Sequence, residues 1–417
     1  MFKEIFKSII VEGWEFISSV EVVPRDVDID MNANYVFTGS RRSGKTYVMY
    51  QIARDFMRKG ISLKQLLFVN FEDERLIGLS ARDLNQILEA YYELITTDTR
   101  PVIFFDEIHI IDGWEKFVRR LADRKYRVFI TGSNARMLSK DIATTLGGRF
   151  IIREIYPLSF REFLRFKGLD YDPQMLYGKQ KHHIRQLFDE YFYFGGFPEH
   201  LSFRNKKEYL SNLFQKLFYG DIIARNNVKN VYALRLMIKR LAEATCDEIS
   251  FTRLANLIKS SGVKVGTATL IEYAQYLEDA YLVFSLKNYR SKFSERESVK
   301  KFYFIDTGIL NLFLQDPDTK LLETIVFNHL KRTQDQMYYF RDNYETDFLL
   351  PDQLLIQVSY TIDNQQTYDR ELRSLMKISQ RLSVDNLLII TMDTEDEINL
   401  QDKKIKVVPV WKWLLRS

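Results

Sequence analysis

The feature that most constrains this chain is an eight-residue glycine-rich loop between a strand-like and a helix-like stretch. The apolar residues 35–38 precede the loop, and the helical pattern of residues 45–59 follows it. Glycines let backbone N–H groups turn inward around a phosphate, and the helix start adds its positive dipole end. A chance match in a Gly/Ser turn is the alternative, but the flanking strand and helix argue against it. The pattern predicts a nucleotide-phosphate site at Gly39, Ser40, Arg41, Arg42, Ser43, Gly44, Lys45 and Thr46.

An acid pair downstream fits the same site. Lys45 can reach the β- and γ-phosphates of a nucleoside triphosphate, and the Thr46 hydroxyl can bind Mg²⁺. The apolar residues 102–105 predict a buried strand that ends in Asp106 and Glu107. We expect Asp106 to support Mg²⁺ through its water shell and Glu107 to orient and polarise the attacking water. The alternative is an acidic helix cap after a buried strand.

Three further polar residues are candidates for the reaction. The predicted strand at 127–132 ends in Ser133 and Asn134, either of which could hydrogen-bond the γ-phosphate or the water. A plain strand-to-turn transition explains them equally well. Arg149 follows two glycines, and an arginine near a nucleotide can neutralise charge in the transition state. A surface ion pair is the other explanation for Arg149.

The order of elements predicts an α/β fold. Apolar strand-like runs at 66–70, 102–105 and 127–132 alternate with helical patterns at 45–59 and 80–94. Continuous apolar strands separated by helices indicate a parallel sheet covered on both faces. We therefore expect a P-loop NTPase sheet in the first part of the chain.

Length and composition limit the remaining choices. A chain of 417 residues can form two to four domains with substantial cores. Its 60 Lys and Arg nearly balance 56 Asp and Glu, so the net charge of +4 predicts no general affinity for polyanions. The lone Cys246 excludes a disulfide framework. There is no signal-peptide pattern and no apolar run of about 18 residues, so we expect a cytoplasmic protein without a membrane partner.

Two motifs are more specific than the glycine-rich loop: the run Pro157-Leu158-Ser159-Phe160-Arg161-Glu162-Phe163 and the turn Gly195-Gly196-Phe197-Pro198. Together with the loop and the acid pair, they resemble a bacterial and archaeal family of AAA-type ATPases joined to a C-terminal domain of unknown function. The resemblance implies that the chain binds ATP, hydrolyses it and acts as a switch. The matching stretches cover nearly the whole chain: 37–46, 102–107, 129–133, 148–149, 156–163, 195–199, 221–225 and 302–308.

We expect four domains: the AAA-type ATPase at 1–160, a helical lid at 161–228, a winged helix-turn-helix at 229–300 and a nuclease-like module at 301–417. The winged-helix part is a weak candidate for reading DNA. Its expected recognition helix, residues 267–281, carries three acids and no Lys or Arg. The segment that follows is more basic and could contact a nucleic-acid backbone through Lys287, Arg290, Lys292, Lys300 and Lys301.

The last domain resembles restriction nucleases but departs from their metal site. Such nucleases use two acids for Mg²⁺ and a lysine two residues beyond the second acid. Here Glu323 and Asp347 are the available acids, whereas Gln357 and Ser359 stand where the second strand acid and the lysine belong. An amide binds Mg²⁺ more weakly than a carboxylate. We therefore expect a nuclease-like fold without nuclease activity.

The leading hypothesis is an ATP-binding and ATP-hydrolysing switch with an unidentified protein partner. The alternative is an ATP-dependent protein that binds or processes DNA. Self-association into a homo-oligomer stays open, because nothing in the composition decides it.

Overall fold

The computed structural model describes residues 2–95, 99–134, 144–291, 299–351, 353–362, 364–400 and 402–416. The chain splits into two compact units, Met1–Tyr156 and Pro157–Ser417. This division falls a few residues before the boundary expected at 160. None of the helices in the described ranges is long and apolar enough to cross a membrane.

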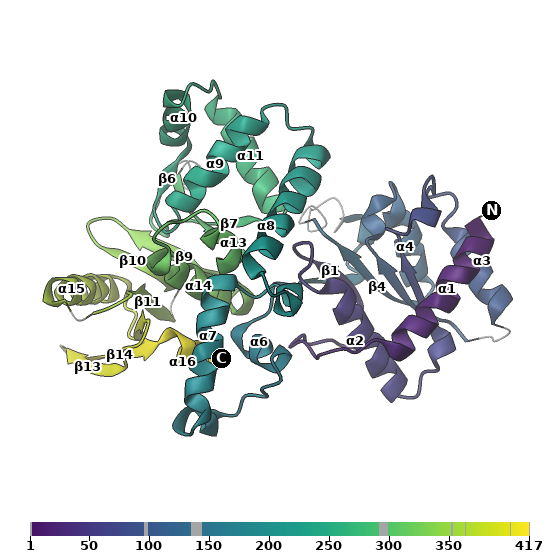
Figure 1. Cartoon of the computed structure of the whole chain (residues 1–417), viewed down its shortest axis with the longest axis horizontal. Coiled ribbons are helices and arrows are strands. Elements are labelled where there is room, and N and C mark those ends of the chain that lie inside the picture. The colour runs from purple at the N-terminus through teal and green to yellow at the C-terminus, as the bar shows by residue number, and fades with distance from the viewer. Residues whose placement is uncertain are drawn as a thin grey trace. The chain divides into compact units, whose positions relative to one another are not determined.

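The first unit is built on a five-stranded, all-parallel sheet, drawn in purple to blue in Figure 1. Its strand order, β2-β3-β4-β1-β5, places the strand before the glycine-rich loop between two later strands. The predicted parallel sheet of a P-loop NTPase is thereby confirmed. The strands are β1 (Asn34–Thr38), β2 (Leu66–Asn70), β3 (Val102–Asp106), β4 (Arg127–Gly132) and β5 (Phe150–Glu154).

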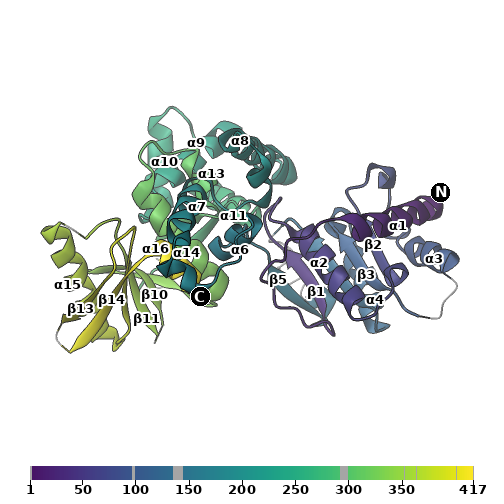
Figure 2. The same ribbon diagram turned by 60° about the horizontal axis from the view of Figure 1, so that its bottom comes forward.

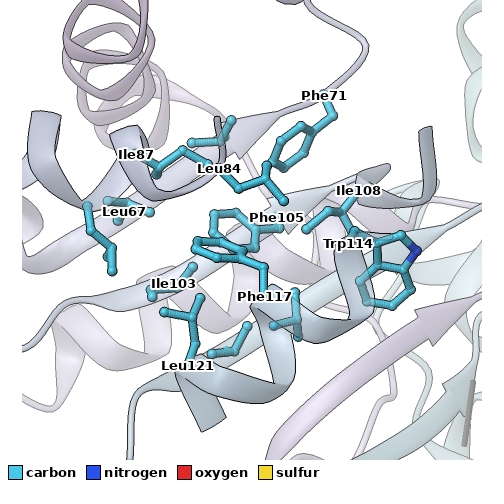
Figure 3. Packing of buried hydrophobic residues seen from close by; sticks show 14 of the residues in the cluster. Leu67, Phe71, Leu84, Ile87, Ile103, Phe105, Ile108, Trp114, Phe117 and Leu121 are labelled. Atoms are coloured by element: carbon cyan, nitrogen blue, oxygen red, sulfur yellow. The ribbon is translucent and has the colours of Figure 1, made fainter. Parts of the chain in front are cut away.

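Helices cover both faces of this sheet because alternate strand residues are apolar on both sides. In β2, Leu66 and Phe68 pack with helix α2 (Lys45–Arg58), whereas Leu67 and Val69 pack on the opposite face. That second face is covered by α3 (Asn85–Leu94) and α4 (Trp114–Asp123). Figure 3 shows part of the resulting core, with Phe105 surrounded by side chains from both helices.

The N-terminal helix protects the edge of the sheet. Helix α1 (Phe2–Ser19) lies along β2, and the Trp14 indole donates a 2.7 Å hydrogen bond to the carbonyl of Leu66. An uncovered edge strand would offer unpaired backbone groups to other chains. Helix α1 thus closes the sheet on the side away from the loop-bearing strand.

The second unit begins with helices. The segment 161–228 contains the helices expected there, and within it an α-helix gives way to a π-helical turn at residue 217. This part contains α6 (Phe160–Phe166), α7 (Gln180–Phe194), α8 (Lys206–Lys216) and η7 (Leu217–Ala224).

A small helical cluster with a three-stranded sheet follows. The sheet order is β6-β8-β7, with strands β6 (Ile249–Ser250), β7 (Val283–Leu286) and β8 (Val299–Phe304). Its helices are α9 (Val231–Glu243), α10 (Phe251–Ser260) and α11 (Thr267–Asp279). Strand β8 runs through the boundary that the sequence suggested at residue 300.

The end of the chain forms a mixed six-stranded sheet between helices. Figures 1 and 2 show α15 (Gln365–Leu382) on one side of it and α14 (Asp318–Thr333) and α16 (Val410–Arg416) on the other. A short helix, α13 (Thr307–Asn311), precedes α14. The sheet order is β13-β14-β12-β11-β10-β9, with strands β9 (Tyr338–Arg341), β10 (Glu345–Leu350), β11 (Leu354–Val358), β12 (Leu387–Thr391), β13 (Asp396–Leu400) and β14 (Lys403–Pro409).

Candidate functional site

Three neighbouring strand ends bring the predicted site residues together. Strands β3, β4 and β1 are adjacent and parallel, so their carboxyl ends meet at one edge of the sheet. The glycine-rich loop follows β1, the acid pair ends β3, and Ser133 follows β4. Ligands of open α/β sheets bind at this kind of edge.

The loop backbone depends on its glycines. Gly39 has φ +146°, and a Cβ there would lie 2.1 Å from the carbonyl oxygen of Ile155. Gly44 has φ +95° and directly precedes α2. Side-chain-bearing residues rarely adopt these conformations. The loop is therefore shaped by close backbone approach on one side and by the start of a helix on the other.

Lys45 lies folded across the loop. Its ammonium donates hydrogen bonds to the carbonyl oxygens of Gly39, at 3.1 Å, and Ser40, at 3.0 Å. It also lies 3.8 Å from Oε1 of Glu107. The side chain is only 4% exposed. The ammonium thus sits at the centre of the loop, where incoming phosphate oxygens would compete for its protons.

Asp106 is buried and faces Thr46. Its carboxylate accepts hydrogen bonds from the hydroxyls of Thr46, at 3.0 Å, and Thr131, at 2.5 Å. Burial raises the pKa of Asp106 to about 6, and the bond from Thr131 acts in the opposite direction. A hydroxyl facing a carboxylate is a donor set that suits Mg²⁺ next to a phosphate. The arrangement fits the ion expected from the sequence.

Glu107 is held in an unusual backbone conformation. Its φ of +53° is left-handed, and it begins the short turn η3 (Ile108–Ile110). Its backbone N–H donates to the hydroxyl of Thr131 at 2.8 Å. Its Oε2 accepts from the backbone N–H of Ser133 at 3.2 Å, and the same oxygen lies 3.2 Å from Nδ1 of His109. Strained residues of this kind concentrate at functional sites.

Two buried hydroxyls at this edge lack partners. Neither Oγ of Ser43 nor Oγ of Ser133 has a hydrogen-bond partner among the residues that the structure describes. Asn134 is buried beside Ser133. Buried polar groups are normally satisfied, so an orphaned pair next to a lysine and two acids is what a polar ligand would complete.

Sequence reasoning missed two residues that support the site. Thr131 bonds to both Asp106 and Glu107, and so fixes the acid pair as one unit. The guanidinium of Arg25 donates at 2.9 Å to the carbonyls of Ser43 and Tyr156 and braces the loop from below. Thr131 is on β4, the strand next to the one that ends in the acid pair, and Arg25 is a single arginine in a connecting segment. Neither residue belongs to a recognisable sequence motif.

The structure does not bring Arg149 to the loop. Phe150, the next residue, pairs with Asn34 at the amino end of β1, whereas the loop follows its carboxyl end. The Arg149 guanidinium pairs with Asp123, and one of its N–H groups donates at 3.0 Å to Gly147. The expectation that Arg149 acts at this chain's own phosphate loop is therefore wrong. Arg41, a loop residue, pairs at 2.9 Å with Glu72.

A second lysine–carboxylate cluster lies in the other unit. Lys301, on β8, is 1% exposed and lies 3.1 Å from Glu345 and 3.7 Å from both Glu323 and Asp347. Burial lowers the pKa of Lys301, but the three carboxylates outweigh it and hold the pKa above its usual value. Lys301 is therefore not available for the nucleic-acid backbone contact expected of this basic segment, because its side chain is buried. Lys292 lies outside the described residues.

The remaining groups of this cluster are mostly satisfied internally. The Tyr303 hydroxyl donates to Glu323 at 2.6 Å, and the backbone N–H of Val358 donates to Asp347 at 2.8 Å. The Ser359 hydroxyl, which stands in the position of the lysine of restriction nucleases, donates to the carbonyl of Thr361. Gln357 is buried, and its Oε1 has no partner among the described residues.

The Gly-Gly-Phe-Pro turn has a structural partner within the second unit. Asp306 accepts hydrogen bonds from the backbone N–H groups of Gly196, Gly308 and Ile309 at 2.7, 2.9 and 3.2 Å. Gly195 has φ +74°, and a Cβ there would lie 2.0 Å from Asp306 Oδ1. The turn at 195–198 and the stretch 302–308, both of which belong to the resemblance, therefore join α7 to α13 by direct contact.

Two family models match this chain. Residues 32–164 match a family model described as an AAA domain, and residues 185–320 match a domain of unknown function, DUF8612. The uncharacterized protein MJ1544 of Methanocaldococcus jannaschii is 36% identical over 99% of this chain and 96% of its own length. An uncharacterized protein of Haemophilus influenzae is 29% identical over 91% of this chain and 94% of its own.

Among solved structures, the Walker-type ATPase PABY2304 of Pyrococcus abyssi is 11% identical, with a TM-score of 0.42, over 75% of this chain and 95% of its own. We draw no conclusion about this chain from a structural similarity of that size. The sequence identity over the full length shows the family: the chain belongs to the family of MJ1544, and its residues 32–164 match the AAA domain.

Proposed function

We propose that this protein binds ATP, hydrolyses it, and acts as a nucleotide-dependent switch. The observation that carries the proposal is the convergence of Lys45, Asp106 and Glu107 on one loop, with Lys45 Nζ 3.8 Å from Glu107. The AAA-domain match supports ATP, rather than another nucleoside triphosphate, as the ligand.

The phosphate-binding half of the site would use the loop and two side chains. The backbone N–H groups of residues 39–46 would surround the β- and γ-phosphates, with Lys45 turning from the loop carbonyls to phosphate oxygens. Thr46 and Asp106 would hold Mg²⁺, which supplies positive charge beside the phosphates. The α2 N-terminus adds a favourable dipole.

The hydrolytic half would use Glu107 with Ser133 and Asn134. Glu107 would accept a proton from the attacking water, which then bonds to the γ-phosphorus as the bond to the bridging oxygen of ADP breaks. The Ser133 hydroxyl, buried without a partner among the described residues, and the neighbouring Asn134 amide would bond to the γ-phosphate or to the water. We assign Arg149 no part in this site.

Substitution of Glu107 by Gln tests the hydrolytic role. We expect the variant to bind ATP normally and to lose at least about a hundredfold in turnover, because general-base contributions are of that order. Steady-state phosphate release and ATP titration give the two quantities. Glu89→Gln, which removes an exposed carboxylate of the same unit, is the matched control. Normal turnover in Glu107→Gln would contradict the assignment.

The switch role has its own test. Glu107→Gln should hold ATP without hydrolysing it, so a pull-down with ATP should enrich one partner that is absent with ADP. An identical set of bound proteins in both nucleotide states would contradict the switch.

For the second unit we propose a winged-helix-like part and a nuclease-like part without cleavage activity. The arrangement of α9, α10 and α11 with the sheet β6-β8-β7 supports the first. The second is supported by Lys301, whose ammonium already neutralises carboxylates that would otherwise bind a metal ion. Mg²⁺-dependent DNA cleavage that disappears in Asp347→Ala would overturn this, and would favour a DNA-processing role.

A further inference from the structure

We propose that His109 is a positioning residue for ATP hydrolysis. Nδ1 of His109 lies 3.2 Å from Oε2 of Glu107, and a turn of the ring would let its N–H donate to that oxygen and keep Oε1 directed toward the phosphate loop. The inference rests on the proposed role of Glu107 as the group that accepts the water proton.

The two oxygens of Glu107 have different surroundings. Oε2 accepts from the Ser133 backbone N–H at 3.2 Å and lies 3.2 Å from His109 Nδ1, a contact that is not aligned as a hydrogen bond in this structure. Oε1 instead faces the Lys45 ammonium at 3.8 Å. Both side chains are mostly buried, with 12% of Glu107 and 18% of His109 exposed. One oxygen is therefore anchored by the protein, while the other is directed at the loop.

Buried apolar neighbours hold the backbone around His109. Ile108 is fully buried, and Ile111 and Trp114 are 6% and 2% exposed. Figure 3 shows Ile108 and Trp114 packed beside Phe105 in the core. Backbone hydrogen bonds from Ile110 to Glu107 and from Ile111 to Ile108 close the turn. With its apolar neighbours anchored in the core, His109 lies beside Glu107 on a rigid turn.

Nucleotide binding would change only one of these contacts. Lys45 would turn to the phosphates and release Oε1, which then becomes the oxygen that accepts the water proton. The contacts at Oε2 do not involve the loop, so His109 and the Ser133 amide can hold the carboxylate throughout. A base whose orientation is fixed in advance loses less free energy on reaching the transition state.

The geometry predicts which substitutions can replace His109. The Nδ2 amide of Asn stands near the position of Nδ1, whereas the Nε2 amide of Gln stands near the position of the other ring nitrogen. We therefore expect His109→Asn to retain most of the turnover. His109→Ala and His109→Gln should each lower kcat by about tenfold or more, the range for one hydrogen bond to a charged group.

The experiment measures kcat, the KM for ATP, ATP affinity and melting temperature for these three variants beside the wild type. The expected result is a loss in kcat alone for Ala and Gln, with rescue by Asn. An unchanged kcat in Ala, or an Asn variant as slow as Ala, overturns the inference. A parallel loss of melting temperature and ATP affinity also overturns it, because that pattern marks a packing role.

The same measurements separate this inference from the proposed function. A wild type that binds ATP but does not turn it over overturns the proposed function, and the inference with it. A wild type that hydrolyses ATP, with Glu107→Gln inactive and His109→Ala unaffected, overturns only the role of His109.

Discussion

The two units each bury a lysine among carboxylates, but they leave it in opposite situations. In the first unit, Lys45 bonds to two backbone carbonyls and meets one carboxylate at 3.8 Å. In the second, Lys301 lies within 3.1–3.7 Å of three carboxylates. Lys45 can exchange its neutral partners for phosphate oxygens, whereas Lys301 would have to leave the buried carboxylates of Glu323 and Asp347.

The hydroxyl groups show the same difference. Ser43 and Ser133 have buried hydroxyls without partners among the described residues, at the edge where Lys45 lies. Around Lys301, Tyr303 and the backbone of Val358 bond to the carboxylates, and Gln357 Oε1 is left over. The same residue types therefore build an open binding site in one unit and a largely closed structural cluster in the other. Which one forms depends on what else satisfies the charges.

Removal of the first lysine should have the largest effect. Lys45→Ala should weaken ATP binding by about a hundredfold or more, because several charge-assisted bonds to phosphate are lost together. The fold should persist, since Lys45 contacts two neutral backbone carbonyls and a carboxylate at 3.8 Å rather than a closed cluster of charges. Titration of ATP by calorimetry measures the loss, and exposed Lys64→Ala is the control. An unchanged ATP affinity in Lys45→Ala would contradict the assignment of Lys45 to a phosphate-binding site.

Removal of the second lysine should affect stability instead. Lys301→Met should lower the free energy of unfolding by about 3–5 kcal/mol, because it leaves buried carboxylates without their cation. ATP affinity should be unchanged. Urea denaturation measures the effect, with Lys300→Met, the half-buried neighbour, as the control. If Lys301→Met is as stable as wild type, the cluster is not the closed structural element described here.

The turn bound by Asp306 should also behave as a structural element. Gly195→Ala should cost about 2–4 kcal/mol, from a positive φ and a Cβ 2.0 Å from the Asp306 carboxylate. Gly178→Ala is the matched control, since a Cβ there meets no atom within 4 Å and its φ is −112°. Melting temperature reports both variants. Equal stability of the two would show that the turn does not lock the second unit.

The smallest expected effect is a loss of folding stability at acidic pH. Burial lowers the pKa values of His200 and His329 to about 4, below the usual value near 6.5. Each group is neutral in the fold and takes up a proton on unfolding. Stability from each is therefore present above pH 6.5 and is lost as pH falls toward 4, by about 1–3 kcal/mol.

Urea midpoints at pH 7 and pH 5 measure this loss. His200→Gln should show a smaller difference between the two pH values than wild type, whereas the exposed His183→Gln should not. A pH difference that His200→Gln leaves unchanged would show that the buried histidine does not titrate on unfolding.

The local parts of the open site could be predicted from the sequence. The glycine-rich loop, the acid pair and Ser133 each follow an apolar strand, and parallel pairing brings those ends together. The support from Thr131 and Arg25 could not be predicted, because it depends on which strands are neighbours and where a connecting segment crosses. Arg149 was misplaced for the same reason: only the register of β5 shows that it precedes the amino end of its strand.

The closed cluster was harder to foresee. On the sequence alone, Lys301 groups with the basic residues nearby. Lys301 lies two residues before Tyr303, and residues two apart on a strand share a face, so this spacing could have indicated that the two side chains are neighbours. Glu323, Asp347 and Gln357 were identified as a group, but a lysine from β8 as their cation was not. Contacts between distant elements carry no local pattern, and these decide whether a charged cluster is open or closed.

The most direct test of the central claim compares one acid from each cluster. Steady-state ATP hydrolysis should be measured for wild type, Glu107→Gln and Asp347→Asn under the same conditions. We expect wild type to hydrolyse ATP, Glu107→Gln to lose at least about a hundredfold in turnover, and Asp347→Asn to show near-normal turnover. Turnover that survives in Glu107→Gln, or that disappears in a folded Asp347→Asn, would contradict the central claim.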